Sequence, residues 1–291
     1  MTQFILNGLA MYGWLAIVAA SFAILFRVAG FFHFAHGLAI TAGPYCLFFL
    51  LARSVPFAPS LILALICSGA VGVAVHGFVY RNVARHGLNP LALLLASLGV
   101  YLIGQNFISL FCGDDPVTPS HALLDGSLTV LGGRISGTNC ICLLLSFVVA
   151  FLSGPVLAVT SLGKSMRAIA ANRRLSVELG IQTERVMVLT YFLASAAAGL
   201  GGIMIAYDTS ARPTMGIDAL LPAVVAVVLG GNTGIKGVLC AALLLAMTTH
   251  IGVMYLSSLW QQSIVFAVLL VFLLFRAFAR GPQIVASNGS S

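Results

Sequence analysis

Long apolar stretches separated by short polar breaks make up most of this chain. The candidate membrane spans are residues 4–26, 37–52, 59–80, 90–112, 139–159, 186–207, 219–230, 238–255 and 259–278. A helix needs about 20 residues to cross the hydrocarbon core of a bilayer, so the stretch at 219–230 is too short for a full crossing. The pattern predicts eight or nine transmembrane helices, with a half-helix or re-entrant segment at 219–230.

The composition favours lipid as the solvent for most of the chain. Hydrophobic residues make up 60% of the sequence and charged residues 7%, against about 25% charged in an average soluble domain. The apolar stretches are continuous, whereas the strands of a membrane β-barrel alternate in character every second residue. We predict an all-α polytopic membrane protein, with one transmembrane domain over residues 1–282 and a disordered C-terminal tail over residues 283–291. The first stretch lacks a preceding basic region and is longer than a signal peptide's apolar region, which favours a retained span.

The distribution of charge predicts an orientation. The net charge is +7, but the basic residues lie at the ends of the predicted spans, which argues against nucleic-acid binding. If residues 160–185 lie in the cytoplasm and every one of the nine stretches crosses, eleven of the fourteen Lys and Arg residues fall on the cytoplasmic side, and the exceptions are Arg53, Arg134 and Arg212. This excess follows the positive-inside rule and places the N-terminus outside and the C-terminus in the cytoplasm.

The acidic residues avoid the middle of the predicted spans. Glu178 and Glu184 fall within residues 160–185, and the five aspartates fall in or beside the predicted outer loops. Ion-driven carriers usually need an ionisable or densely polar site inside the membrane, so this pattern argues against one, although backbone carbonyls can bind sodium. The sequence carries no Ser-His-Asp, Cys-His or paired-carboxylate arrangement, so we do not predict an enzyme.

Residues 160–185 form the longest polar stretch, and we predict that they make one or two short amphipathic helices that lie across the inner membrane surface with their apolar side toward the bundle. On a helical wheel one arc is charged and another is apolar; the charged arc holds Lys164, Arg167, Arg174 and Glu178, and the apolar arc holds Met166, Ile169, Ala170 and Val177. Arg174 and Glu178 are i,i+4 partners, and Gly180 suits the left-handed position that ends a helix. From these residues alone, the segment fits either contact with anionic lipid headgroups or docking of a cytosolic partner.

Four motifs follow one another along the chain. They are FHFAHG at 32–37, SLG through QN at 97–106, GKSMRAIA through ELGI at 163–181, and GGNTGIKG at 230–237. Together they resemble the permease family of branched-chain amino-acid ABC transporters, over nearly the whole chain. His33 stands where that family usually has asparagine, and Ser176 and Val177 stand where it commonly has alanine.

The resemblance implies a permease subunit of an ATP-driven ABC importer in the bacterial inner membrane. Its cargo would be branched-chain amino acids or small relatives such as amides and urea. The implied partners are a second, similar permease subunit, two cytoplasmic ATPase subunits, membrane lipid and an extracytoplasmic solute-binding protein, which would dock on the outer loop at 114–139. The ATPase subunits would hydrolyse ATP, and this chain would bind no cofactor. The implied ATPase-coupling residues are Gly163, Lys164, Arg167, Ala168, Arg174, Glu178, Leu179 and Gly180.

A second set of candidate residues lies on the predicted substrate pathway. Glycines interrupt the apolar pattern near residues 30–37 and 230–237, and broken segments of this kind often flank transporter sites. In the fourth span, polar residues recur every four positions and form a stripe that fits either pathway lining or hydrogen bonding between helices. The predicted pathway residues are Phe34, His36, Gly37, Ser97, Tyr101, Gln105, Asn106, Gly230 and Gly231.

Three further patterns limit the alternatives. His33 and His36 could share a metal, but no further ligand accompanies them, so we predict no metal site and expect both imidazoles to bond to backbone carbonyls. The string GGNTGIKG does not match GxxxxGK[ST], which argues against nucleotide binding.

Small residues four apart in the sixth span predict close helix packing, within the chain or with a second subunit; they are Ser195 with Gly199 and Ala198 with Gly202. A stand-alone ion-coupled transporter or a channel remains the alternative function.

Overall fold

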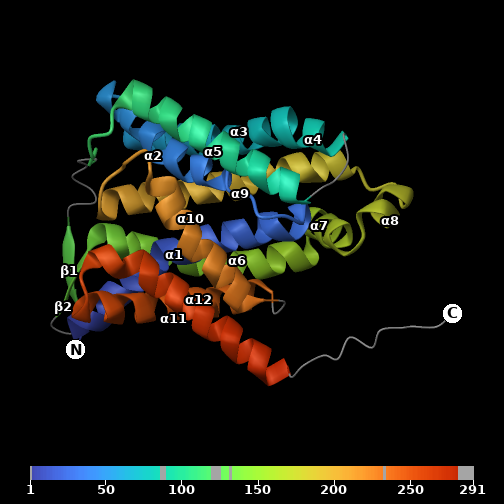
Figure 1. Ribbon diagram of the computed structural model, residues 1–291. Coiled ribbons are helices and arrows are strands. Elements are labelled where there is room, and N and C mark those ends of the chain that lie inside the picture. The colour runs from blue at the N-terminus through green and yellow to red at the C-terminus, as the bar shows by residue number, and fades with distance from the viewer. Residues whose placement is uncertain (1, 86–89, 119–125, 131–132, 232–233, 281–291) are drawn as a thin grey trace.

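The computed structural model describes residues 2–85, 90–118, 126–130, 133–231 and 234–280, and Figure 1 shows them as a helix bundle. The predicted tail at 283–291 lies outside the described residues. The helices are α1 (Thr2–Ala29), α2 (His36–Ala52), α3 (Phe57–Val75), α4 (Arg81–Arg85), α5 (Pro90–Cys112), α6 (Gly137–Val159), α7 (Ser161–Ala171), α8 (Arg173–Glu178), α9 (Thr183–Asp208), α10 (Met215–Gly230), α11 (Ile235–Tyr255) and α12 (Gln261–Arg280). A π-helical turn, η1 (His76–Tyr80), joins α3 to α4, and a 3₁₀ turn, η2 (Ser258–Trp260), precedes α12.

The predicted spans are confirmed as helices with small shifts at their ends. Six helical segments of the described chain are long and apolar enough to cross a membrane, and three shorter apolar helices accompany them. One of the shorter helices is α10, which begins four residues before the predicted segment at 219–230. Its 16 residues remain short for a full crossing.

The helices run between two ends of the bundle, as Figure 1 shows. One end carries α4, α7 and α8, and we call it the α7–α8 end. The other carries the N-terminus and two antiparallel strands, β1 (Ser127–Val130) and β2 (Gly133–Ser136), and we call it the hairpin end. The strands were not predicted, because the segment at 114–139 was treated as a loop. Gln3 fixes β2 to α1, since its amide bonds to both the backbone N–H and the carbonyl of Arg134 at 2.8 Å.

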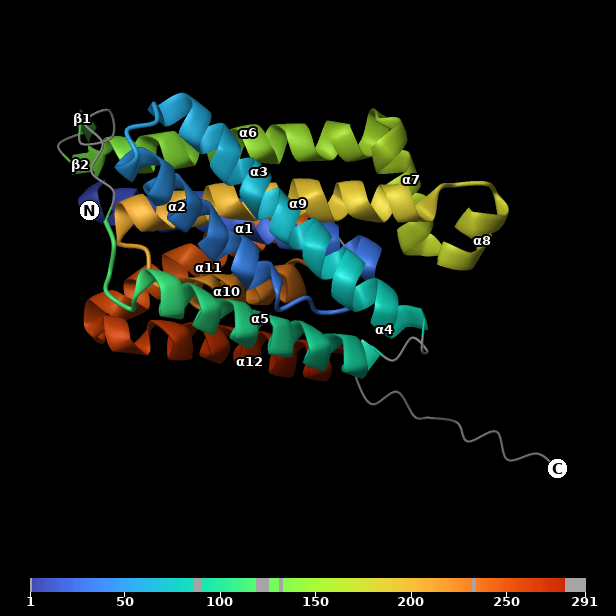
Figure 2. The ribbon, with the colours of Figure 1, turned by 90° about the horizontal axis from the view of Figure 1, so that it is seen from above.

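The helix α1 forms the centre of the bundle. Residues 15–20 are fully buried, and α1 packs against α6, α9, α10 and α11. In contrast, α5 and α12 expose long rows of apolar side chains, including Leu102, Ile103, Phe107, Leu110, Val271, Leu274, Phe275 and Phe278. Figure 2 places α5 and α12 on the same side of the bundle, and Figure 1 shows α10 between them. We call this side the α5–α12 face. Its apolar rows fit lipid or another apolar protein surface.

Close packing of α9 against α2 depends on glycine and proline. Pro44 lies inside α2 and has no N–H, so the carbonyl of Ile40 loses its usual partner within the helix. Gly202 of α9 lies directly against this carbonyl, where any Cβ would overlap the oxygen and would come within 2.8 Å of the carbonyl carbon. One turn away, a Cβ on Gly43 would lie 2.6 Å from the carbonyl oxygen of Gly199. The small residues of α9 therefore serve packing within the chain.

A second proline exposes a carbonyl that another helix uses. Pro222 lies inside α10 and leaves the carbonyl of Asp218 without a partner from its own helix. The side-chain amide of Gln262, at the start of α12, donates a hydrogen bond to that carbonyl at 3.0 Å. Because α12 has few other buried side chains, this bond helps to fix where α12 begins on α10.

Candidate functional site

The polar segment at 160–185 folds as two short helices joined at Asn172. The hydroxyl of Thr160 caps α7 by accepting from the backbone N–H of Gly163 at 3.0 Å, and Asn172 Oδ1 caps α8 by accepting from the N–H of Leu175 at 3.1 Å. Asn172 itself is extended, with φ −157° and ψ 104°. We call residues 160–182 the α7–α8 loop. The predicted pair of short helices is therefore present, and the break at Asn172 turns α8 away from the axis of α7.

The first of these helices is held firmly to the bundle. Met166 and Ile169 are buried against it, as predicted for the apolar arc, and Gly163 is buried beside them. The guanidinium of Arg167 donates hydrogen bonds to the carbonyls of Leu157 and Ala158, the second at 3.2 Å. These carbonyls belong to the last turn of α6, which carries the negative end of the helix dipole. Arg167 is thus a brace between α6 and α7.

The second helix projects away from the bundle, as Figure 1 shows for α8 at one end of the molecule. Leu175, Val177 and Leu179 are half or more exposed. We call these three residues the apolar tip. The prediction that Val177 faces the bundle was wrong, because the break at Asn172 changes the register and Ser176 is buried instead.

The remaining predicted coupling residues lie on α7 and α8 and at the end of α8. Lys164, Arg174 and Glu178 are exposed, and Ala168 is half-buried. Gly180 has φ +78°, which confirms the predicted left-handed position after α8. Arg174 and Glu178 are both described, and their side chains form no ion pair with each other within 4 Å. Both charges are therefore free to meet a partner molecule.

The predicted pathway residues near the start of α2 do come together. Ser21 and Phe22 of α1 lie against His36, so α2 begins about two turns before α1 ends, inside the bundle. The hydroxyl of Ser97 accepts from the backbone N–H of Phe34 at 3.1 Å, which ties the non-helical segment 30–35 to α5. The predicted broken helix is therefore present at this point.

Tyr101 joins α5 to the start of α10. Its hydroxyl accepts from the N–H of Ile217 at 3.1 Å and donates to the carbonyl of Thr214 at 3.4 Å. Gly37 lies beside it, since a Cβ there would be 2.8 Å from the Tyr101 ring. We call Phe34, His36, Gly37, Ser97 and Tyr101 the break cluster. Apart from the half-buried Phe34, its members are buried.

The other predicted pathway residues lie apart from the break cluster. Gln105 is half-buried further along α5, and Asn106 is exposed and donates to the carbonyl of Leu102 in its own helix at 2.7 Å. Gly230 packs against the backbone of Val238, and Gly231 follows it in the tight turn between α10 and α11. The late glycine-rich motif thus forms a helix turn, of which residues 232–233 lie outside the described part.

The two histidines of the early motif bond to hydroxyl groups. His33 Nδ1 lies 2.6 Å from Tyr80 Oη, and His36 Nε2 lies 3.1 Å from Ser21 Oγ. The prediction of backbone carbonyl partners was wrong, because the segment is surrounded by side chains of α1 and η1. The described residues hold no group of three or more His, Cys, Asp and Glu side chains that could share a metal ion.

Tyr101→Phe is expected to lower the free energy of unfolding by about 1 kcal/mol, because two backbone groups at the start of α10 lose one shared partner. Unfolding of the purified chain in mixed micelles of increasing SDS content measures this difference. Tyr255→Phe is the matched control, since that side chain is 82% exposed. An equal loss in both variants would contradict a specific role for the Tyr101 hydroxyl.

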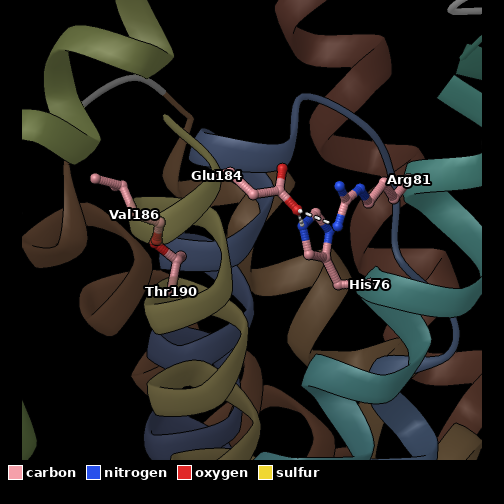
Figure 3. A network of polar contacts seen from close by, with 5 residues as sticks. All are labelled: His76, Arg81, Glu184, Val186 and Thr190. Atoms are coloured by element: carbon pink, nitrogen blue, oxygen red, sulfur yellow. Dashed lines mark hydrogen bonds and ion pairs between the residues drawn. The ribbon is translucent and has the colours of Figure 1, made fainter. Parts of the chain in front are cut away.

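A polar network at the α7–α8 end was not predicted. Figure 3 shows the imidazole of His76 between the carboxylate of Glu184 and the guanidinium of Arg81. His76 Nε2 lies 3.5 Å from Glu184 Oε1, and Arg81 Nη1 lies 3.9 Å from the same oxygen. The His76 ring also stacks on Tyr191, with the ring centroids 4.5 Å apart. His76 lies in η1, and π-helical turns are frequent at functional sites.

The described structure combines apolar helices long enough to span a membrane, a broken helix inside the bundle and a basic loop with an exposed apolar tip. These features are those of a polytopic membrane permease with a projecting loop at one end. The family model described as "Branched-chain amino acid transport system / permease component" matches residues 4–274, and the chain belongs to this family.

Several permeases are similar over most of their length. The high-affinity branched-chain amino acid transport system permease protein LivH of Salmonella typhimurium is 26% identical, over 94% of this chain and 92% of LivH. BraD of Pseudomonas aeruginosa, which has the same description, is 25% identical over 94% of this chain and 93% of BraD. The nucleoside ABC transporter permease protein NupB of Lactococcus lactis is 26% identical over 81% of this chain and 68% of NupB.

Proposed function

We propose that this chain is the membrane-spanning subunit of an ATP-driven importer, and that its cargo is a branched-chain amino acid or a related small polar solute. Membership of the permease family and the names of LivH and BraD support the cargo class. The apolar tip of the α7–α8 loop carries the proposal for the energy source. Apolar side chains on a projecting helix need a protein partner to cover them, and a cytoplasmic ATPase subunit would provide that surface.

We place the α7–α8 end in the cytoplasm. Lys164, Arg167, Arg173 and Arg174 all lie in the α7–α8 loop, and an excess of basic residues is typical of the cytoplasmic side. The N-terminus and the hairpin would then face outward, where a solute-binding protein would deliver cargo. ATP would be bound and hydrolysed in the partner subunits, with no cofactor held by this chain.

Force would pass from the ATPase into the bundle through short, well-braced connections. Closure of an ATPase pair would move the apolar tip, and Asn172 joins α8 to α7 without a flexible linker. Arg167 would carry this movement to the end of α6, and α9 follows the loop directly at Thr183. Because α9 packs tightly on α2 and α3, the movement would reach the break cluster.

We also propose that the α5–α12 face meets a second permease subunit. Its exposed apolar rows would be covered in that assembly, and α10 would lie close to the subunit boundary. The stripe of α5 would then bring Gln105 and Asn106 near the interface. A substrate pathway between two such subunits would be lined by α5 and α10.

Reconstitution into proteoliposomes tests the proposed function. Labelled L-leucine uptake is expected only when this chain is combined with its second permease, ATPase subunits and binding protein, and when ATP is supplied on the α7–α8 side. Uptake by this chain alone, driven by a sodium or proton gradient, would contradict the proposal and support a stand-alone carrier. Leucine equilibration without ATP would support a channel.

A further inference from the structure

A small cavity at the α7–α8 end includes no residue of the break cluster and none of the apolar tip. Its volume is about 230 Å³, and it is bounded by η1, by the start of α4, by α9 and by Arg173 of α8. Pockets for drug-sized ligands usually range from about 300 to 1,000 Å³, so this one suits a smaller solute.

One side of the cavity is charged and holds unsatisfied polar atoms. Arg81, Arg173 and Glu184 line it. His76 also lines it with its side chain only 5% exposed; its Nε2 faces Glu184 Oε1 at 3.5 Å, whereas its Nδ1 has no hydrogen-bond partner within the described part of the chain. The buried hydroxyl of Tyr191 is likewise without a partner among the described residues. Buried polar groups are normally hydrogen-bonded, so these atoms point to a ligand that completes the set.

Other residues that line the cavity are apolar. They are Phe31, Leu93 and Met187, and each is less than one-tenth exposed. Apolar walls of this kind take up an aliphatic side chain, whereas a cavity for an inorganic anion would need polar groups on every side.

We infer that this cavity binds a small zwitterion with an aliphatic side chain, the chemical class of the branched-chain amino acids. The two guanidinium groups would bind its carboxylate, Glu184 would bind its ammonium group, and the apolar wall would hold its side chain. The lining thus offers groups of both charges to a ligand that carries both. The identification of the ligand with the cargo rests on the proposed function.

A ligand bound in this cavity would contact the α7–α8 loop directly. Arg173 is the first residue of α8, whereas His76 and Arg81 belong to the continuous segment of α3, η1 and α4. Glu184 begins α9, immediately after the α7–α8 loop. A bound amino acid would therefore join the loop to the bundle from the side on which imported cargo accumulates.

Equilibrium binding of labelled L-leucine to the purified full-length chain in lipid nanodiscs tests this inference. Saturable binding is expected, and 4-methylvalerate, which lacks the ammonium group, and isoamylamine, which lacks the carboxylate, should each compete at least about tenfold less well than leucine. Glu184→Gln and Arg173→Gln should each weaken leucine binding by about tenfold or more. Arg185→Gln is the matched control, because this exposed neighbour of Glu184 does not line the cavity.

Each variant is first checked for the elution volume and thermal stability of the unmodified chain. The inference is overturned if leucine does not bind saturably, if Glu184→Gln binds leucine as tightly as the unmodified chain, or if Arg185→Gln weakens binding equally. If 4-methylvalerate competes as well as leucine, the site recognises a simple carboxylate, and the assignment of a zwitterionic ligand is overturned. This test can fail while the proposed function holds. If Glu184→Gln binds leucine as tightly as the unmodified chain and leucine is still imported with ATP, the cavity is not the binding site and the importer function stands.

Discussion

Arg167→Glu is expected to reduce ATP-driven uptake to the level seen without ATP, while the helix bundle stays folded. The substitution removes the donors to the carbonyls of Leu157 and Ala158 and places a carboxylate beside the negative end of α6. Hydrogen bonds to charged groups contribute about 1.5–3 kcal/mol, so the brace between α6 and α7 would be lost. The ATPase could then move α8 without moving the bundle. Uptake into proteoliposomes and elution from a sizing column measure the two properties.

Arg185→Glu is the matched control, because it reverses the charge of an exposed arginine at the start of α9, directly after the α7–α8 loop. It is expected to keep most of the uptake. Arg167→Lys should be intermediate, since one ammonium group cannot hold two carbonyls in the geometry of a guanidinium. If Arg167→Glu imports leucine at the normal rate, the α6–α7 brace does not transmit force.

Gly202→Ala is expected to have the largest effect on stability. Its Cβ would overlap the carbonyl oxygen of Ile40, and backbone atoms of α2 and α9 would have to move apart. Overpacking of this kind typically costs about 1–3 kcal/mol, and a backbone obstacle favours the upper part of that range. Thermal unfolding of the purified chain in detergent should therefore begin at a clearly lower temperature.

Gly99→Ala is the control for Gly202→Ala. A Cβ at Gly99 meets nothing within 4 Å, and alanine is the better helix former. It should leave the unfolding temperature unchanged or raise it slightly. Equal destabilisation by both substitutions would mean that the contact between α2 and α9 is not tight.

The helices could be predicted from the sequence because lipid imposes a minimum length of continuous apolar residues. The break before His36 was predictable for a related reason, since glycines and histidines interrupt an otherwise apolar stretch. Gly180 could be assigned to a left-handed position from its place after a polar helix, and its φ of +78° confirms this. These are local properties, which a single segment reveals without knowledge of its neighbours.

The partners across the bundle could not be predicted, because they join residues far apart in the chain. Tyr101 bonds to Ile217, and His76 meets Glu184 more than 100 residues away. The carbonyl that Pro44 leaves without a partner lies against α9, and the carbonyl that Pro222 leaves without a partner accepts a hydrogen bond from α12. Both contacts depend on how the helices cross. The orientation of Val177 was predicted wrongly for a local reason, since the capping role of Asn172 was overlooked.

The capping role of Asn172 could have been recognised from the sequence. Asn172 stands between an apolar-periodic helix and a second basic segment, and asparagine is among the preferred residues for starting a helix. A helical wheel drawn separately for residues 173–178 would not have placed Val177 on the same face as Met166. The strands of the hairpin end also had a signal that was overlooked, since Ser127-Leu128-Thr129-Val130 and Arg134-Ile135-Ser136 alternate between polar and apolar residues around a Gly-Gly pair.

Photo-crosslinking from the apolar tip tests most directly whether a separate ATPase drives this chain through the α7–α8 loop. Val177 is replaced by p-benzoyl-L-phenylalanine in the assembled, transport-active complex, and Leu259 at the hairpin end, which is 89% exposed, is replaced in the same way as a control. We expect an adduct with the ATPase subunit from position 177 and none from position 259. An active complex that gives no ATPase adduct at 177, or gives one at 259, would contradict the proposed coupling.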